Sequence, residues 1–112
     1  MNQKHDLLIQ IYTEMLPEIR EVGKQNGYAI AIHGSLRRDF DLIAVPWTQE
    51  AKCKEHLVSE IAKRLGLNER HTIMAKDEEI KPHGRSAYAI QLGFGMYIDL
   101  SIMPIISGGN QS

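Results

Sequence analysis

The sequence predicts an α+β domain of two layers, in which helices pack on one face of a mixed β-sheet. Two segments repeat apolar residues at a spacing of three and four, which is typical of helices with one buried face. Five shorter segments are rich in apolar and β-branched residues and end at glycine, proline or polar residues, which is typical of strands. The predicted order along the chain is helix, strand, strand, helix, strand, strand, strand.

The first predicted helix spans residues 3–25 and ends at an Asn-Gly pair, where Gly27 suits a left-handed terminal residue. Pro17 interrupts its apolar pattern, so we expect a kink or a break into two helices at this position. The second predicted helix spans residues 48–68, with Thr48 as the candidate N-cap.

The first two predicted strands, residues 28–34 and 39–45, are separated by only a few residues. A tight reversal is therefore expected to place them side by side. A short strand is predicted at residues 71–75. The last two strands, residues 86–92 and 96–103, are joined by the sequence GFG, which indicates a hairpin.

The length of 112 residues indicates one domain, for which we expect residues 1–106, followed by a flexible tail at 107–112. The composition, with 43% hydrophobic and 24% charged residues, is that of an ordinary globular protein. A net charge of −1 gives no general attraction to nucleic acid, so strong binding to duplex DNA is not expected.

The sequence also indicates a cytoplasmic location. The single cysteine, Cys53, cannot form an internal disulfide, and the N-terminus has no signal-peptide pattern. No apolar run approaches the roughly 20 residues that a membrane-spanning helix needs.

Carboxylates in predicted strands are the strongest indication of function. Side chains alternate between the faces of a strand, so Asp39 and Asp41 point to one face while Phe40 and Leu42 point to the other. Asp99 occupies a similar position in the last strand, between two apolar residues. Clustered carboxylates repel one another unless a cation lies among them, and carboxylate oxygens are the ligands that suit Mg²⁺ or Mn²⁺.

Simpler explanations exist for each of these features. Arg37 and Arg38 would neutralise the nearby acids as surface ion pairs. Gly34-Ser35 could bind a phosphate through its backbone and hydroxyl group, but the simpler explanation is an ordinary turn. Likewise, the segment Lys81–Arg85 is either a phosphate-contacting loop above the acidic residues or a solvated hairpin loop.

The arrangement of Gly-Ser, Asp-x-Asp in a strand and a third Asp in a later strand resembles the nucleotidyltransferase superfamily, which includes DNA polymerase β-like enzymes. The order of the elements over about residues 5–104 is similar to the minimal core of that fold. The sequences "HGSLRRDFDLIAVPW" and "KPHGR…YIDLSIMP" also look like parts of small proteins encoded in bacteriophages and prophages.

The resemblance implies a nucleoside triphosphate as substrate and Mg²⁺ or Mn²⁺ as cofactor. It implies phosphate binding by Gly34 and Ser35, metal binding by Asp39 and Asp41, and a third metal ligand or general base at Asp99. Arg37 and Arg38 are further candidates for contact with the triphosphate, although no family motif matches them.

The implied reaction is metal-dependent transfer of a nucleoside monophosphate from the triphosphate to a hydroxyl group of a small molecule, a protein or a nucleic acid. The alternative is a catalytically inactive phage protein of the same fold that binds a host protein or a nucleotide. Only residues 36–38 separate Gly-Ser from Asp-x-Asp, and we expect no additional substrate domain in the 112 residues, and both points favour this alternative. A metal-dependent hydrolase or nuclease is the third hypothesis.

Overall fold

The computed structural model describes residues 3–34, 40–68, 72–74, 84–93 and 95–105. These residues form two helices and five strands, in the order expected from the sequence. The elements are α1 (Gln3–Gln25), β1 (Tyr28–Ile32), β2 (Phe40–Pro46), α2 (Lys54–Arg64), β3 (Thr72–Met74), β4 (Ser86–Gly93) and β5 (Met96–Ile102).

The strands form one mixed sheet in the order β1-β2-β5-β4-β3. The first two strands pair antiparallel, as the tight reversal predicts, and β4 and β5 form the expected hairpin. The last strand, β5, lies between β4 and β2, and its pairing with β2 is parallel. Two strands that are far apart in the sequence are thereby neighbours at the centre of the sheet.

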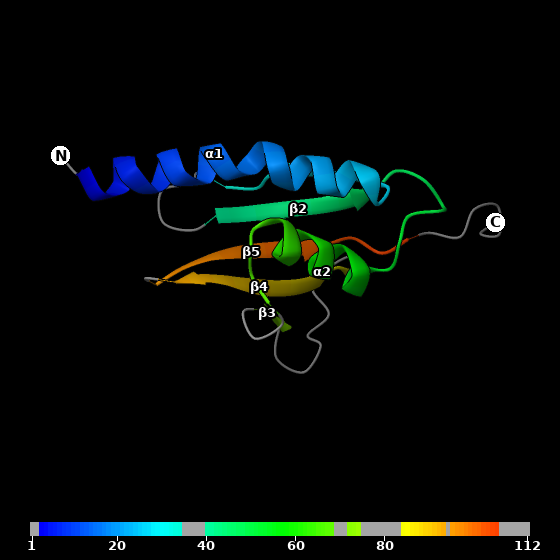
Figure 1. Ribbon diagram of the computed structural model, residues 1–112. Coiled ribbons are helices and arrows are strands. Elements are labelled where there is room, and N and C mark those ends of the chain that lie inside the picture. The colour runs from blue at the N-terminus through cyan, green and yellow to red at the C-terminus, as the bar shows by residue number, and fades with distance from the viewer. Residues whose placement is uncertain (1–2, 35–39, 69–71, 75–83, 94, 106–112) are drawn as a thin grey trace.

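The two helices pack on the same face of this sheet, which confirms the predicted two-layer α+β fold (Figure 1). Apolar residues of α1 and α2 join those of the four longer strands in one core. At its centre, Tyr12 of α1 stacks on Phe40 of β2 with ring centroids 4.5 Å apart. Phe40 is completely buried, so this contact contributes both buried area and aromatic packing.

The other face of the sheet is not covered by either helix, and we call it the open face. Strand alternation assigns to it Asp41, Ile43 and Val45 of β2 and Tyr97, Asp99 and Ser101 of β5, all of them half-buried or exposed. Their chain neighbours Phe40, Leu42, Ala44, Ile98, Leu100 and Ile102 are buried beneath the helices. The prediction that β2 has one packed face and one face carrying Asp41 is therefore confirmed.

The predicted start of the second helix is wrong. The helix begins at Lys54, with Cys53 as an N-cap that makes no side-chain hydrogen bond, so Thr48 is not the cap. The backbone before it is held by contacts with the turn between α1 and β1. Lys52 N donates a hydrogen bond to Asn26 O at 2.9 Å, and Tyr28 Oη donates one to Lys52 O at 2.7 Å. These long-range bonds override the local helical pattern.

Pro17 does not divide α1, which continues as a single helix from Gln3 to Gln25. Proline removes one hydrogen bond to the carbonyl four residues earlier, but Pro17 lies on the exposed side, where water can bond that carbonyl instead. Gly27 has a φ of 89°, in agreement with the expected left-handed residue. Neither helix in the described part of the chain is long and apolar enough to cross a bilayer.

Candidate functional site

Two of the three predicted aspartates are neighbours on the open face. In the parallel pairing of β2 with β5, Asp41 and Asp99 occupy the same register position. Adjacent strands are about 4.8 Å apart, so two carboxylates on one face at this position lie close together. Their negative charges repel each other, and a cation bound between them would remove this repulsion.

Gly34 adjoins this pair on the side of β1. His33 N donates a hydrogen bond to Asp41 O at 2.7 Å, which continues the β1–β2 pairing beyond the end of β1. The next residue, Gly34, has a φ of 122°, a conformation that side-chain-bearing residues rarely adopt. A Cβ atom at Gly34 would lie 3.3 Å from Asp41 Oδ2. Glycine therefore allows the backbone to pass directly beside the carboxylate.

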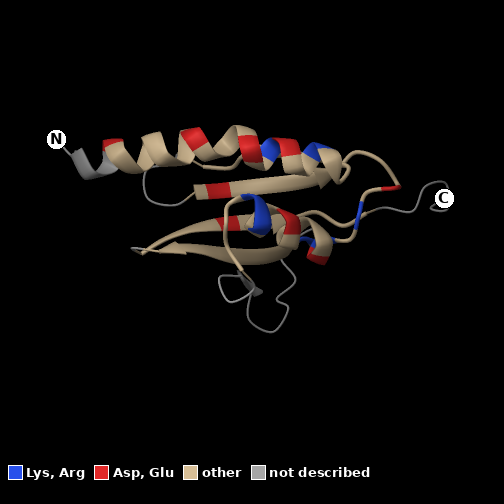
Figure 2. Ribbon diagram, in the orientation of Figure 1, with Lys and Arg blue, Asp and Glu red and all other residues tan. Residues whose placement is uncertain are grey.

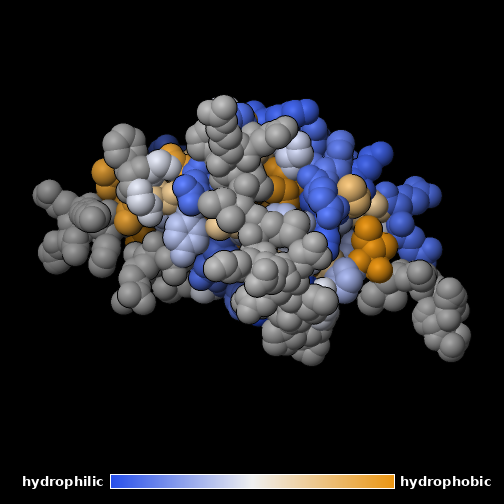
Figure 3. Space-filling model, turned by 90° about the horizontal axis from the view of Figure 1, so that it is seen from below, coloured by the Kyte–Doolittle hydropathy of each residue, from blue (hydrophilic) through white to orange (hydrophobic). Residues whose placement is uncertain are grey.

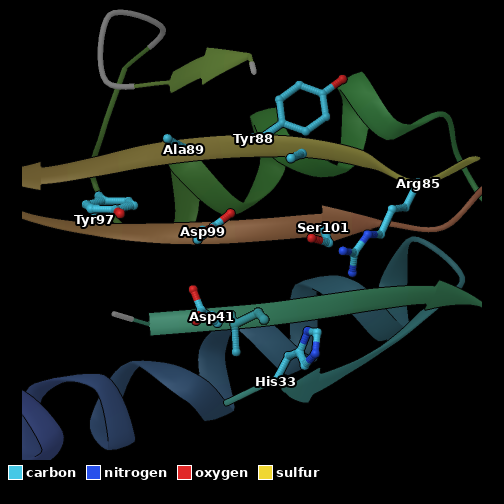
Figure 4. Close-up of a pocket in the computed structure, with 10 residues that line it drawn as sticks. His33, Asp41, Arg85, Tyr88, Ala89, Tyr97, Asp99 and Ser101 are labelled. Atoms are coloured by element: carbon cyan, nitrogen blue, oxygen red, sulfur yellow. The ribbon is translucent and has the colours of Figure 1, made fainter. Parts of the chain in front are cut away.

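A pocket of ≈ 380 Å³ lies above these residues on the open face. This volume is within the range of small-molecule sites. The polar residues that line it are His33, Asp41, Arg85, Tyr88, Tyr97, Asp99 and Ser101. Figure 2 marks the acidic positions of β2 and β5 in red near the centre of the sheet, and Figure 4 shows the pocket itself with the labelled side chains.

Arg85 supplies a positive charge to the same pocket. It directly precedes β4, and Figure 4 shows its guanidinium group ending between Ser101 and His33, in front of β5 and β2. Its Nε atom is buried and has no hydrogen-bond partner among the described residues. The pocket thus contains two carboxylates and one guanidinium group, which is a suitable combination for a bound cation together with an anionic ligand.

The remaining predicted site residues, Ser35, Arg37, Arg38 and Asp39, lie outside the described part of the chain. Of the three predicted aspartates, the structure therefore describes Asp41 and Asp99. Within the described residues, no group of three or more histidine, cysteine, aspartate or glutamate side chains is close enough to hold a metal ion.

The sequence prediction did not include Tyr97 and Ser101 in the site. Both flank Asp99 at a spacing of two, so the alternation that identified Asp41 could have identified them as well. His33, which directly follows β1, is exposed at the edge of the pocket. In the segment Lys81–Arg85 the structure describes Gly84 and Arg85, and Arg85 lines the pocket.

A second hollow of ≈ 580 Å³ lies where β2 and β5 end, and we call it the apolar groove. It is lined by Val45, Pro46, Trp47, Thr48, Gln49, Met103, Pro104 and Ile105. Trp47 is 63% exposed. Figure 3 shows apolar surface toward the same end of the molecule as the C-terminus in Figure 1. An exposed tryptophan beside other apolar residues is typical of a binding surface.

The structure thus carries a polar pocket around Asp41 and Asp99 on the open face, and an apolar groove where β2 and β5 end. Comparisons of the chain with models of protein families, with curated proteins and with solved structures find no match.

Proposed function

We propose that the chain is a metal-dependent nucleotidyltransferase that uses a nucleoside triphosphate and an acceptor hydroxyl group. The observation that carries this proposal is the placement of Asp41 and Asp99 at one register position of two adjacent strands, facing a pocket on the open face. The close approach of Gly34 to Asp41 supports it, because a side chain there would crowd the carboxylate.

The residues present fit a hard divalent cation. Mg²⁺ is commonly held by one or two carboxylates together with phosphate groups of the substrate, so Asp41 and Asp99 suffice as its protein ligands. Asp39 is the further ligand that the sequence predicts. When bound, Mg²⁺ or Mn²⁺ supplies neutralisation of phosphate charge and polarisation of the reacting phosphate.

In the proposed reaction, the acceptor hydroxyl oxygen forms a bond to the α-phosphorus of the nucleotide. The bond from this phosphorus to the bridging oxygen breaks, and pyrophosphate leaves with the electron pair. The hydroxyl proton passes to a carboxylate of the site, for which Asp99 is the candidate. With a cation bound, Asp41 and Asp99 would also help to position the triphosphate for the reaction.

Thermal unfolding with nucleotides tests this proposal. A ligand present at 100 times its dissociation constant stabilises the native state by about 2.7 kcal/mol. For 112 residues the entropy of unfolding is about 0.24 kcal/mol/K, so the expected rise in Tm is about 11 °C. The rise should require Mg²⁺ and should disappear in Asp41→Asn and Asp99→Asn.

The matched control is Asp6→Asn, which removes an aspartate from the first turn of α1, outside the pocket. It should retain the full nucleotide-dependent shift. No shift with any nucleoside triphosphate, or an equal shift in all three variants, contradicts the proposal. Product analysis with nucleotide labelled at the α-phosphate then separates transfer to an acceptor from hydrolysis.

The apolar groove favours a second candidate function, in which the domain binds a partner protein without catalysis. A phage protein acting on a host protein would be of this kind. The two functions differ in the residues on which they depend. Binding through the groove should persist in Asp41→Asn and be lost in Trp47→Asp, whereas nucleotidyl transfer should show the opposite pattern.

A further inference from the structure

We infer that Arg85 binds the phosphate groups of the substrate, so that the pocket holds a polyphosphate between a guanidinium group and the carboxylate-bound cation. This inference deepens the proposed function and rests on it for the identity of the substrate, a nucleoside triphosphate. It follows from the position of Arg85 in the pocket, from the burial of its Nε atom, and from the lack of an acidic partner for it among the described residues.

The position of Arg85 brings its charge to the carboxylates from a different strand. The pairing of Ala87 with Ser101 and of Ala89 with Asp99 places Arg85 toward the end of β5, beyond Ser101. Its side chain extends back toward Ser101, as Figure 4 shows. Ser101 and Asp99 are two residues apart, or about 7 Å along the strand. A phosphate chain can therefore contact the guanidinium group at one end and a cation at Asp99 at the other.

The Nε atom of Arg85 is available to a ligand. Arg85 takes part in none of the ion pairs between described residues. These pairs join Lys63 to Glu60 and Arg64 to Glu18 and Glu21. The Nε atom of Arg85 is buried without a partner among the described residues. A buried donor without a partner is costly, and guanidinium groups bind phosphate oxygens through two parallel hydrogen bonds.

Ser101 and His33 complete this part of the pocket. Both line it beside the guanidinium group, and both carry groups that donate hydrogen bonds to phosphate oxygens. Two carboxylates alone would repel a triphosphate. Arg85 counters this repulsion at one end of the pocket, and the cation counters it at the other.

The test uses inorganic tripolyphosphate as a probe, with EDTA to remove divalent cations. The variant Asp99→Asn serves as the background, because it lowers the repulsion between the pocket and the anion. Tripolyphosphate should raise its Tm, and the rise should be lost when Arg85→Gln is added and partly kept with Arg85→Lys. Lys63→Gln, which removes an exposed positive charge outside the pocket, should keep the rise in full.

A second arm uses the otherwise unchanged protein with Mg²⁺. Arg85→Gln should weaken binding of a nucleoside triphosphate by about 10- to 100-fold, the loss expected for a charge-assisted hydrogen bond. Binding of the corresponding monophosphate should weaken less, since it offers fewer phosphate oxygens.

The two arms separate this inference from the proposed function. An equal response to tripolyphosphate with and without Arg85, or no response in the Asp99→Asn background, overturns the role of Arg85. A response that depends on Arg85, combined with no effect of Mg²⁺ and nucleotide on the unchanged protein, leaves the phosphate site in place and overturns nucleotidyl transfer. Because Arg85→Lys keeps the charge and most of the side-chain volume, it also controls for a folding defect in Arg85→Gln.

Discussion

Gly34→Ala tests whether the backbone beside Asp41 is part of the site. The φ of Gly34 is 122°, and a side chain in such a conformation costs about 1–3 kcal/mol. With an unfolding entropy of about 0.24 kcal/mol/K for 112 residues, this cost lowers the Tm by about 4–13 °C. The new Cβ would also lie 3.3 Å from Asp41 Oδ2, so the carboxylate must shift.

Gly66→Ala is the matched control for this variant. Gly66 has a φ of 80°, so alanine is strained there as well, but an added Cβ meets no atom within 4 Å. Both variants should therefore lose stability in urea or thermal unfolding without ligand. Only Gly34→Ala should also lose the rise in Tm caused by Mg²⁺ and nucleotide. An equal ligand response in the two variants would refute the reasoning that Gly34 serves the carboxylate.

Three further predictions concern stability alone. Asp99→Asn removes a like-charge contact between neighbouring strands, so the free energy of unfolding of the unliganded protein, measured in urea, should rise by about 0.2–1 kcal/mol. A decrease would show that the repulsion is already compensated. Phe40→Ala should lower the free energy of unfolding by about 3–5 kcal/mol, because Phe40 is fully buried. Trp47→Ala should change it by less than about 0.5 kcal/mol, because Trp47 is largely exposed. Similar losses in the two variants would contradict the assignment of Phe40 to the core and of Trp47 to the surface. Burial raises the pKa of Tyr28 above 10.0, so the contribution of the protonated Tyr28 side chain to stability is complete below pH 10 and is lost as the pH rises further. Tyr28→Phe should cost about 1 kcal/mol at pH 7, because the hydrogen bond to Lys52 O is lost. Between pH 9 and pH 11 this variant should lose less stability than the unchanged protein.

The sequence was sufficient to predict the elements and the faces of the strands, because both depend on local periodicity. The alternation of Phe40, Asp41 and Leu42 is visible in three consecutive residues, and the helix α1 follows from its apolar spacing. The start of α2 was predicted wrongly because Lys52 is held by backbone bonds to the turn after α1. Such long-range contacts have no signature in the local sequence.

The same distinction applies to the site. Local alternation indicated that Asp41 and Asp99 were unusual, but their register as neighbours depends on the parallel pairing of β2 with β5. Such a pairing joins segments more than 50 residues apart, and many registers are compatible with the same apolar pattern. The approach of Arg85 also depends on tertiary structure, because its side chain reaches the pocket across a neighbouring strand.

The most direct test of the central claim is a crystal structure of the protein grown or soaked with Mn²⁺ and a nucleoside triphosphate, with anomalous scattering used to locate the metal. The proposed site predicts an anomalous peak coordinated by carboxylate oxygens of both Asp41 and Asp99, with the phosphates on the side of Arg85. The peak should be absent from crystals of Asp41→Asn. Bound nucleotide with no metal at these two carboxylates, or metal bound only elsewhere, would contradict the claim.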